Sequence, residues 1–308
     1  MLKQLVDRFI AVPMVGVDVG SAALKVVELA QTDHRLIIRR AAIASLDQGA
    51  DAADSLKQLL SDAGISATQA ALGLASPEVI VKPFQFPPMP KKELASAIQL
   101  EAEESILNGH LPNDMAMDWH VLSSKETIRG LLAVVPKKAV AGRLKIAREA
   151  GLRPAVVDVE GLALWNAYWT LVGARDPAPK TVFLVNVGAK TTNLVIAKGP
   201  DELMLIRDLQ FGAEALAAGQ ESDWVADARD SISYAFSVGG MRTLDAVYVT
   251  GGGSGPTLIP LLKAAVSAPL TFWNPLNQLE RDPDAPSISD AQGPLLAIAI
   301  GLALRQPS

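Results

Sequence analysis

The sequence of 308 residues contains no cysteine and only three histidines, His34, His110 and His120. Because cysteine is absent, disulfides and thiolate metal sites are excluded. A zinc site would need the histidines to converge with carboxylates. Their spacing does not favour that arrangement, so we expect solvated or capping histidines. The formal net charge is -5 and there is no basic stripe, which argues against a surface for nucleic acid.

Long apolar runs are also missing. The longest late run, residues 295–304, is about half of the roughly 20 residues that a membrane span needs. The N-terminus does not fit a secretory signal, because Asp7, Arg8 and Pro13 interrupt it before a long apolar core forms. We therefore expect a cytoplasmic protein. Apolar side chains within residues 2–10 have helical spacing, which favours a short helix on the protein's own core; a membrane-surface or partner-binding helix is the alternative.

Apolar residues are plentiful, at 49 % of the chain, and its length is enough for two domains with large cores. Against this background a glycine turn occurs twice, within residues 15–27 and 184–195, each time between two apolar strands. Glycine lets the backbone turn tightly and lets its N–H groups face an anion. Two such turns on two similar lobes could hold one phosphate chain from both sides, so we predict a nucleotide cleft.

The first part of the chain predicts a lobe with a mixed sheet. Three strands in meander order precede a helix, capped by Asp51 and stopped at Gly64, and another strand follows. Because strands and helices do not alternate, a sheet with an antiparallel edge is expected rather than a doubly wound one. The expected strands are residues 14–19, 24–30, 35–45, 70–75 and 155–159, and the expected helices are residues 51–63 and 161–172.

A second lobe repeats this order after a proline-rich linker at residues 176–179. Its expected strands are residues 181–187, 192–197, 203–209 and 246–250, with helices at 213–218, 223–237, from 256 onward and at 289–304. A strand–helix–strand–strand–helix insert is expected at residues 79–86, 91–107, 117–122, 128–135 and 137–150. We place the first lobe at residues 1–80, 152–178 and 288–308, the insert at 81–151, and the second lobe at 179–287.

Three segments, residues 17–21, 186–192 and 250–254, resemble the two phosphate loops and the adenosine loop of the actin-like ATPase superfamily. Each motif alone is weak, but all three in this order, each after an apolar strand, are specific. Residues 82–87, 157–161, 273–276 and 299–304 are similar to one family within it, the type IV pilus assembly proteins PilM. The resemblance covers nearly the whole chain. It implies an α/β, ribonuclease H-like fold of two lobes with mixed five-stranded sheets, plus the small α+β insert of PilM and FtsA.

The resemblance implies ATP or ADP with Mg²⁺ in the cleft. Asp18 would reach the metal through water, and Asn186 would take the equivalent place on the second loop. For Lys25, strand alternation leaves open whether it points to the cleft or to solvent, and the triple glycine could also be a tight turn kept for packing. The implied nucleotide contacts are Gly20, Ser21, Ala22, Lys25, Gly188, Ala189, Lys190, Thr191, Thr192, Gly251, Gly252, Gly253 and Ser254.

Two departures from the family pattern argue against efficient turnover. Asn186 stands where an aspartate is usual, so metal affinity and hydrolysis should both fall. The lid, at residues 213–240, has room for only about two helices. Glu160 either polarises an attacking water, as the resemblance implies, or is a solvated glutamate at a helix N-terminus.

The resemblance therefore implies a scaffold of a type IV pilus or related secretion platform, cytoplasmic but held at the inner membrane by its partner. That partner would be a PilN-like bitopic protein bound through its cytoplasmic N-terminal tail, with pilus motor ATPases as possible further partners. The tail would enter a groove between the first lobe and the insert. Candidate anchors, which could equally form the insert core, are Phe84, Phe86, Met89, Leu94 and Ile98. The alternatives are an active ATPase or small-molecule kinase of the same fold, and an FtsA-like filament former.

Overall fold

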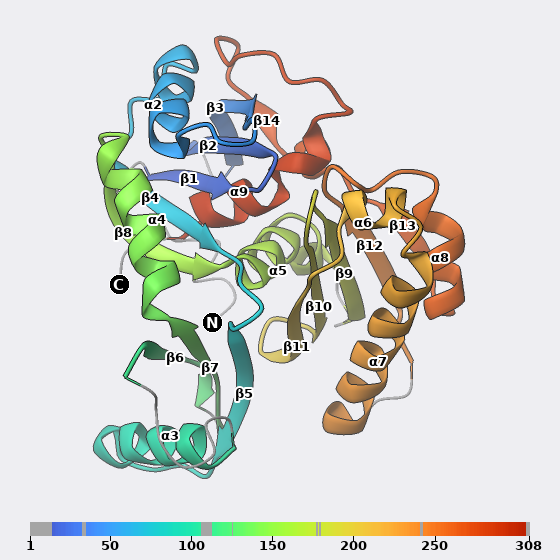
Figure 1. The fold of residues 1–308 in the computed structure, drawn as a ribbon. Helices are drawn as coiled ribbons and strands as arrows, with labels where there is room; N and C mark the ends of the chain where they lie inside the picture. Colours follow the sequence, from blue (N-terminus) through green and yellow to red (C-terminus); the bar gives the residue numbers. More distant parts are fainter. Residues whose placement is uncertain are drawn as a thin grey trace.

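The computed structural model describes residues 14–32, 35–105, 113–124, 126–176, 178, 180–240 and 243–305. Two lobes lie side by side, each built on its own sheet, and the small third sheet lies beyond the first lobe (Figure 1). The helix expected within residues 2–10 lies outside the described residues. No helix in the described part of the chain is both long and apolar enough to cross a membrane.

The first lobe is built on a mixed sheet of six strands in the order β14-β3-β2-β1-β4-β8. Its strands are β1 (Met14–Val19), β2 (Ala23–Thr32), β3 (Arg35–Ser45), β4 (Gln69–Leu74), β8 (Arg153–Val159) and β14 (Glu280–Arg281). The first three form an antiparallel meander, and β4 and β8 add parallel to β1. Every residue of β1 is buried, which fits its central place. The mixed sheet was predicted correctly, whereas a count of five strands was wrong because it missed β14.

Strand β14 also changes the boundary between the lobes. It was assigned to the second lobe, but it pairs parallel with β3 at the edge of the first sheet. Both of its residues are exposed, so no apolar pattern marks it in the sequence.

Helix α2 (Ala52–Asp62) begins as the sequence predicts. The Asp51 carboxylate accepts hydrogen bonds from the N–H groups of Ala53 and Asp54, at 2.7 and 3.1 Å. This contact satisfies two of the donors that a helix N-terminus leaves unpaired. The chain then leaves the helix at Gly64, whose positive φ of 62° suits glycine.

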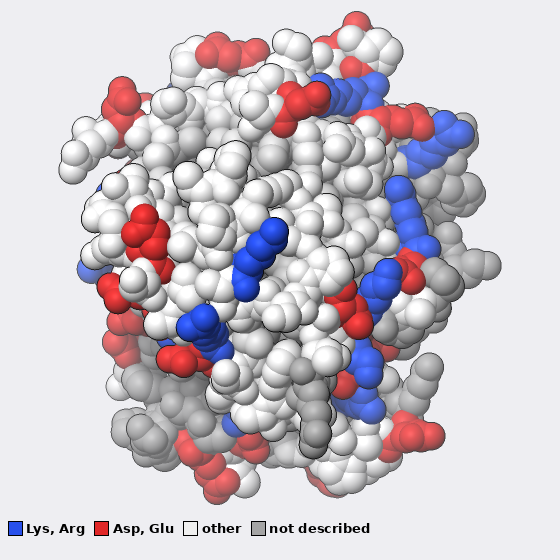
Figure 2. All heavy atoms as spheres, turned by 90° about the vertical axis from the view of Figure 1, so that its right-hand side faces the viewer, with Lys and Arg blue, Asp and Glu red and all other residues white. Residues whose placement is uncertain are grey.

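The second lobe repeats the first: an antiparallel meander followed by a parallel strand, in the sheet order β11-β10-β9-β12-β13. Its elements are β9 (Thr181–Val187), β10 (Thr192–Lys198), β11 (Glu202–Leu209), α6 (Ala213–Ala217), α7 (Glu221–Gly239), β12 (Ala246–Thr250), α8 (Leu258–Ala265) and β13 (Leu270–Phe272). Figure 2 looks onto this lobe from the side that carries α7 and α8, where charged side chains of both signs are scattered among uncharged ones.

The insert has its own three-stranded sheet, in the order β5-β7-β6. Its elements are β5 (Ile80–Phe86), α3 (Lys91–Ser105), β6 (Met115–Ser124), β7 (Ile128–Pro136) and α4 (Lys137–Glu149). Helix α4 leaves this sheet and packs on α2, β4 and β8 of the first lobe. Its Ala147 belongs to the first-lobe core.

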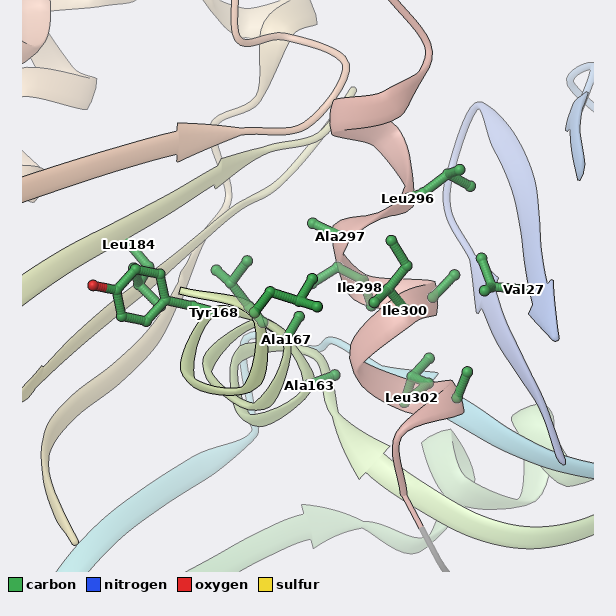
Figure 3. Packing of buried hydrophobic residues seen from close by; sticks show 14 of the residues in the cluster. Val27, Ala163, Ala167, Tyr168, Leu184, Leu296, Ala297, Ile298, Ile300 and Leu302 are labelled. Atoms are coloured by element: carbon green, nitrogen blue, oxygen red, sulfur yellow. The ribbon is translucent and has the colours of Figure 1, made fainter. Parts of the chain in front are cut away.

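Helices α5 (Glu160–Leu171) and α9 (Ala297–Ala303) lie between the lobes (Figure 1). The chain reaches α9 through the short 3₁₀ turn η3 (Gly293–Leu296), so the last helix begins later than predicted; the other 3₁₀ turns are η1 (Gly173–Arg175) and η2 (Pro275–Gln278). A Cβ at Gly301 would overlap the Ala163 carbonyl, which is why the two helices can cross so closely. Their apolar side chains, including Ala167 and Ile298, join both lobes in one core (Figure 3).

Candidate functional site

The two glycine turns have the same backbone geometry. The Gly20 N–H donates to the Ala23 carbonyl at 3.0 Å, and the Gly188 N–H donates to the Thr191 carbonyl at 2.9 Å. Each turn joins the first two strands of its lobe, β1 to β2 and β9 to β10. The duplication seen in the sequence is therefore a duplication of structure.

Glu160 lies between the two lobes and shows that the turns face a common region. It is the first residue of α5 and is 7 % exposed, so the alternative of a solvated helix-end glutamate is wrong. Burial, followed by the negative charges of Asp18 and Asp208, raises the pKa of Glu160 to about 8. Asp18 precedes the first turn and Asp208 ends the second-lobe meander, so carboxylates from both lobes act on Glu160.

Asn193 connects these groups, and sequence reasoning missed it. Its side chain is buried, and its Nδ2 donates to Asp208 Oδ1 at 2.8 Å and to Glu160 Oε2 at 3.4 Å. Its Oδ1 accepts a hydrogen bond from Asn186 Nδ2 at 2.7 Å. No local pattern marks it, because its partners become apparent only when the ladder places it opposite Asn186.

Lys25 occupies the corresponding place in the first turn. It lies opposite Asp18 in the ladder, and its Nζ is 3.0 Å from Asp18 Oδ2. The Lys25 side chain is 14 % exposed and that of Asp18 is 6 % exposed, so the lysine points toward the cleft side rather than into solvent. A Cβ on Gly20 would lie 2.6 Å from the Lys25 Nζ, which places the ammonium directly against the turn.

The residues present do not fit the expected magnesium site. The Asp18 carboxylate is paired with Lys25, and the neutral Asn186 is hydrogen-bonded to Asn193. Among the described residues, no group of three or more His, Asp or Glu side chains could hold a metal ion. The assignment of Asp18 and Asn186 to a metal is therefore corrected.

The triple glycine after β12 packs on the second turn. The Gly253 N–H donates to the Val187 carbonyl at 2.9 Å, and the Ser254 hydroxyl donates to the Gly251 carbonyl at 2.6 Å. Gly251 has a φ of 93°, and a Cβ there would meet Asn186 Oδ1 at 2.7 Å. The third predicted loop thus lies beside the second and packs against it.

Other predicted contacts divide between the cleft and the core. Ser21, Ala22 and Lys190 are exposed on the two turns, and Ala189 and Thr191 are half-buried there. Thr192 is corrected: it is fully buried, with its hydroxyl donating to the Phe211 carbonyl at 2.6 Å.

Two helices, α6 and α7, form the segment that the sequence analysis assigned to a short lid. Helix α6 begins on the second turn, where the N–H groups of Ala213 and Glu214 donate to the carbonyls of Gly188 and Ala189, both at 2.9 Å. Trp224 anchors α7 in the second-lobe core with no exposed surface.

Two grooves adjoin this region. One, of about 550 Å³, runs between residues 76–81, β11 and α7. The other, of about 380 Å³, lies between the end of β4 and α4, where the first lobe meets the insert, which is the place predicted for a partner tail. None of the five predicted anchors lines it. Phe84, Leu94 and Ile98 are buried in the insert core instead. Phe86 and Met89 are partly buried and pack against the same core.

Comparison with known proteins agrees with this architecture. The family model for type IV pilus assembly protein PilM matches residues 16–222. The solved structure of a PilM-PilN type IV pilus biogenesis complex contains a chain with a TM-score of 0.77 and 25% identity, and the match covers 94% of this chain and 97% of that one. A Bacteroides thetaiotaomicron protein with an actin-like ATPase fold gives a TM-score of 0.50 at 10% identity, covering 84% of this chain and 90% of its own. The chain therefore belongs to the family of type IV pilus assembly protein PilM and has the actin-like ATPase fold.

Proposed function

We propose that this protein is a cytoplasmic scaffold of the inner-membrane platform of a type IV pilus or related secretion system. In this role it binds the cytoplasmic N-terminal tail of a PilN-like membrane protein, which holds it at the membrane. The observation that carries the proposal is the family match, together with a similarity that spans almost all of both chains to a protein solved as a PilM-PilN complex.

The groove between the end of β4 and α4 is our choice for the tail. Apolar Leu74 and Ile146 line it together with charged Glu78, Lys138 and Arg143, so it offers both apolar and ionic contacts to an extended peptide. Gly142 gives a direct way to test it. This residue lines the groove on an exposed position of α4, and a Cβ there would meet nothing within 4 Å.

The test is calorimetric titration with a peptide that has the sequence of the cytoplasmic tail of the bitopic protein encoded beside this one. Gly142→Leu fills the groove without a clash and replaces a glycine inside a helix, so folding should be preserved. We expect at least a tenfold loss of tail affinity for Gly142→Leu. Gly142→Ala is the matched control, since it makes the same helix change with one methyl group. An unchanged tail affinity of Gly142→Leu would show that the tail binds at another site. No binding by the unsubstituted protein would contradict the scaffold proposal.

We also propose that the cleft holds ATP or ADP as a structural or regulatory ligand, with little turnover. Because burial raises the pKa of Glu160 to about 8, this carboxyl keeps its proton at neutral pH and is a poor general base. Phosphate release at saturating ATP should stay well below about one per second, the low end for typical enzymes. Faster release would favour the ATPase alternative.

A further inference from the structure

The first turn carries a positive charge of its own, the ammonium group of Lys25. Lys25 Nζ is 3.0 Å from Asp18 Oδ2, and both side chains are largely buried. The same ammonium lies against Gly20, where an added Cβ would come within 2.6 Å of it. It therefore stands at the turn whose exposed residues, Ser21 and Ala22, would face a phosphate group.

The second turn supplies no carboxylate to balance a metal ion. Asn186 is neutral, and its amide donates to Asn193 Oδ1 at 2.7 Å. Asn193 in turn donates to Asp208 at 2.8 Å and to Glu160 at 3.4 Å, so the amide of Asn186 is engaged within the protein. The second turn does carry an exposed cation, Lys190.

These charges disfavour a divalent ion and favour a bare phosphate. Mg²⁺ binds through hard carboxylate oxygens, and to reach Asp18 it would have to displace a largely buried ammonium. A lysine ammonium is a compact positive charge that binds phosphate directly. We propose that the cleft binds the phosphate chain of a nucleotide without a divalent cation, with Lys25 supplying the charge that a metal would otherwise supply. This inference rests on the nucleotide binding proposed above.

The experiment measures ADP and ATP affinity by calorimetry on the full chain, once with Mg²⁺ and once with EDTA. We expect the two affinities to agree within about twofold, because no metal takes part in binding. Lys25→Met should lose at least tenfold in EDTA, whereas Lys25→Arg should keep most of the affinity because it keeps the charge. Lys198→Met is the matched control, since Lys198 is exposed at the opposite end of β10 from the turn.

A second readout uses Mn²⁺ alone, followed by electron paramagnetic resonance. The unsubstituted protein should show no tight Mn²⁺ site that depends on Asp18. Two results would overturn this inference but leave nucleotide binding intact. One is Mn²⁺ binding by the unsubstituted protein that is lost in Asp18→Asn. The other is a nucleotide affinity that disappears in EDTA. No nucleotide binding in either buffer overturns it together with the proposed ligand, and leaves tail docking untouched.

Discussion

The two glycine turns share one geometry but differ in chemistry. In each, a polar residue two positions before the glycine pairs with the residue opposite it in the ladder: Asp18 with Lys25, and Asn186 with Asn193. The first pair is an ion pair at 3.0 Å and the second a neutral amide pair at 2.7 Å. The comparison teaches that glycine and strand pairing set the shape of such a turn, whereas one cross-strand pair sets its charge.

Of the two cross-strand pairs, the ion pair should be the more costly to break. Lys25→Met leaves the Asp18 carboxylate buried and unpaired, and we expect the free energy of unfolding to fall by about 3 kcal/mol. Adding Asp18→Asn makes the first turn neutral like the second, and most of the lost stability should return. Urea unfolding of the two single variants and the double variant gives the coupling directly. Additive losses would mean that the pair at 3.0 Å contributes nothing as a pair.

The neutral pair should cost less to break. Asn193→Ala removes the partner of Asn186, Asp208 and Glu160 at once, and we expect a loss of about 2 kcal/mol because buried polar groups lose their hydrogen bonds. Asn277→Ala, at an exposed position, is the control and should change stability by less than about 0.5 kcal/mol. The same urea series measures both, and equal losses would show that the network does not matter.

These pairs also mark the limit of what the sequence could predict. The turns, the three-strand meanders and the Asp51 cap depend on local residues, so their patterns were sufficient. Asn193 acquires its role only when the ladder places it opposite Asn186 and α5 brings Glu160 to it, and no local pattern carries that information.

The corrected residues follow the same logic. Phe84, Leu94 and Ile98 have the apolar spacing of either a core or a docking face, and only the packing of α3 on β5 and β7 decides for the core. The metal assignment came from the family pattern at Asp18, which cannot show that Lys25 already pairs with it. Local geometry is thus predictable, and the partners of buried charges are not.

The stability of the folded protein should depend on pH through Glu160. In the folded protein, burial raises the pKa of Glu160 to about 8 from its ordinary value of 4.5, so the folded state holds a proton that the unfolded state has lost between those values. This contribution to stability is complete below pH 4.5 and is lost as the pH rises through 8, with a slope of at most about 1.4 kcal/mol per pH unit.

Glu160→Gln keeps the size of this side chain and removes the titratable carboxyl group. The difference in unfolding free energy between the unsubstituted protein and Glu160→Gln should therefore shift in favour of the variant from pH 5 to pH 8. Parallel stability curves for the two proteins over this range would show that the carboxyl titrates normally.

The smallest effect tests the geometry that the two turns share. Neither Gly20 nor Gly188 has a positive φ, and an added Cβ would lie 3.0 Å from a carbonyl oxygen of its own turn in both cases. Alanine at Gly188 should therefore change stability by less than about 1 kcal/mol, since the tight contact is offset by a less flexible unfolded chain. Only Gly20→Ala also meets an ammonium, that of Lys25 at 2.6 Å, and must displace it. ADP affinity in EDTA should consequently fall more for Gly20→Ala than for Gly188→Ala, and equal affinities would mean that the position of Lys25 over the first turn does not control phosphate binding.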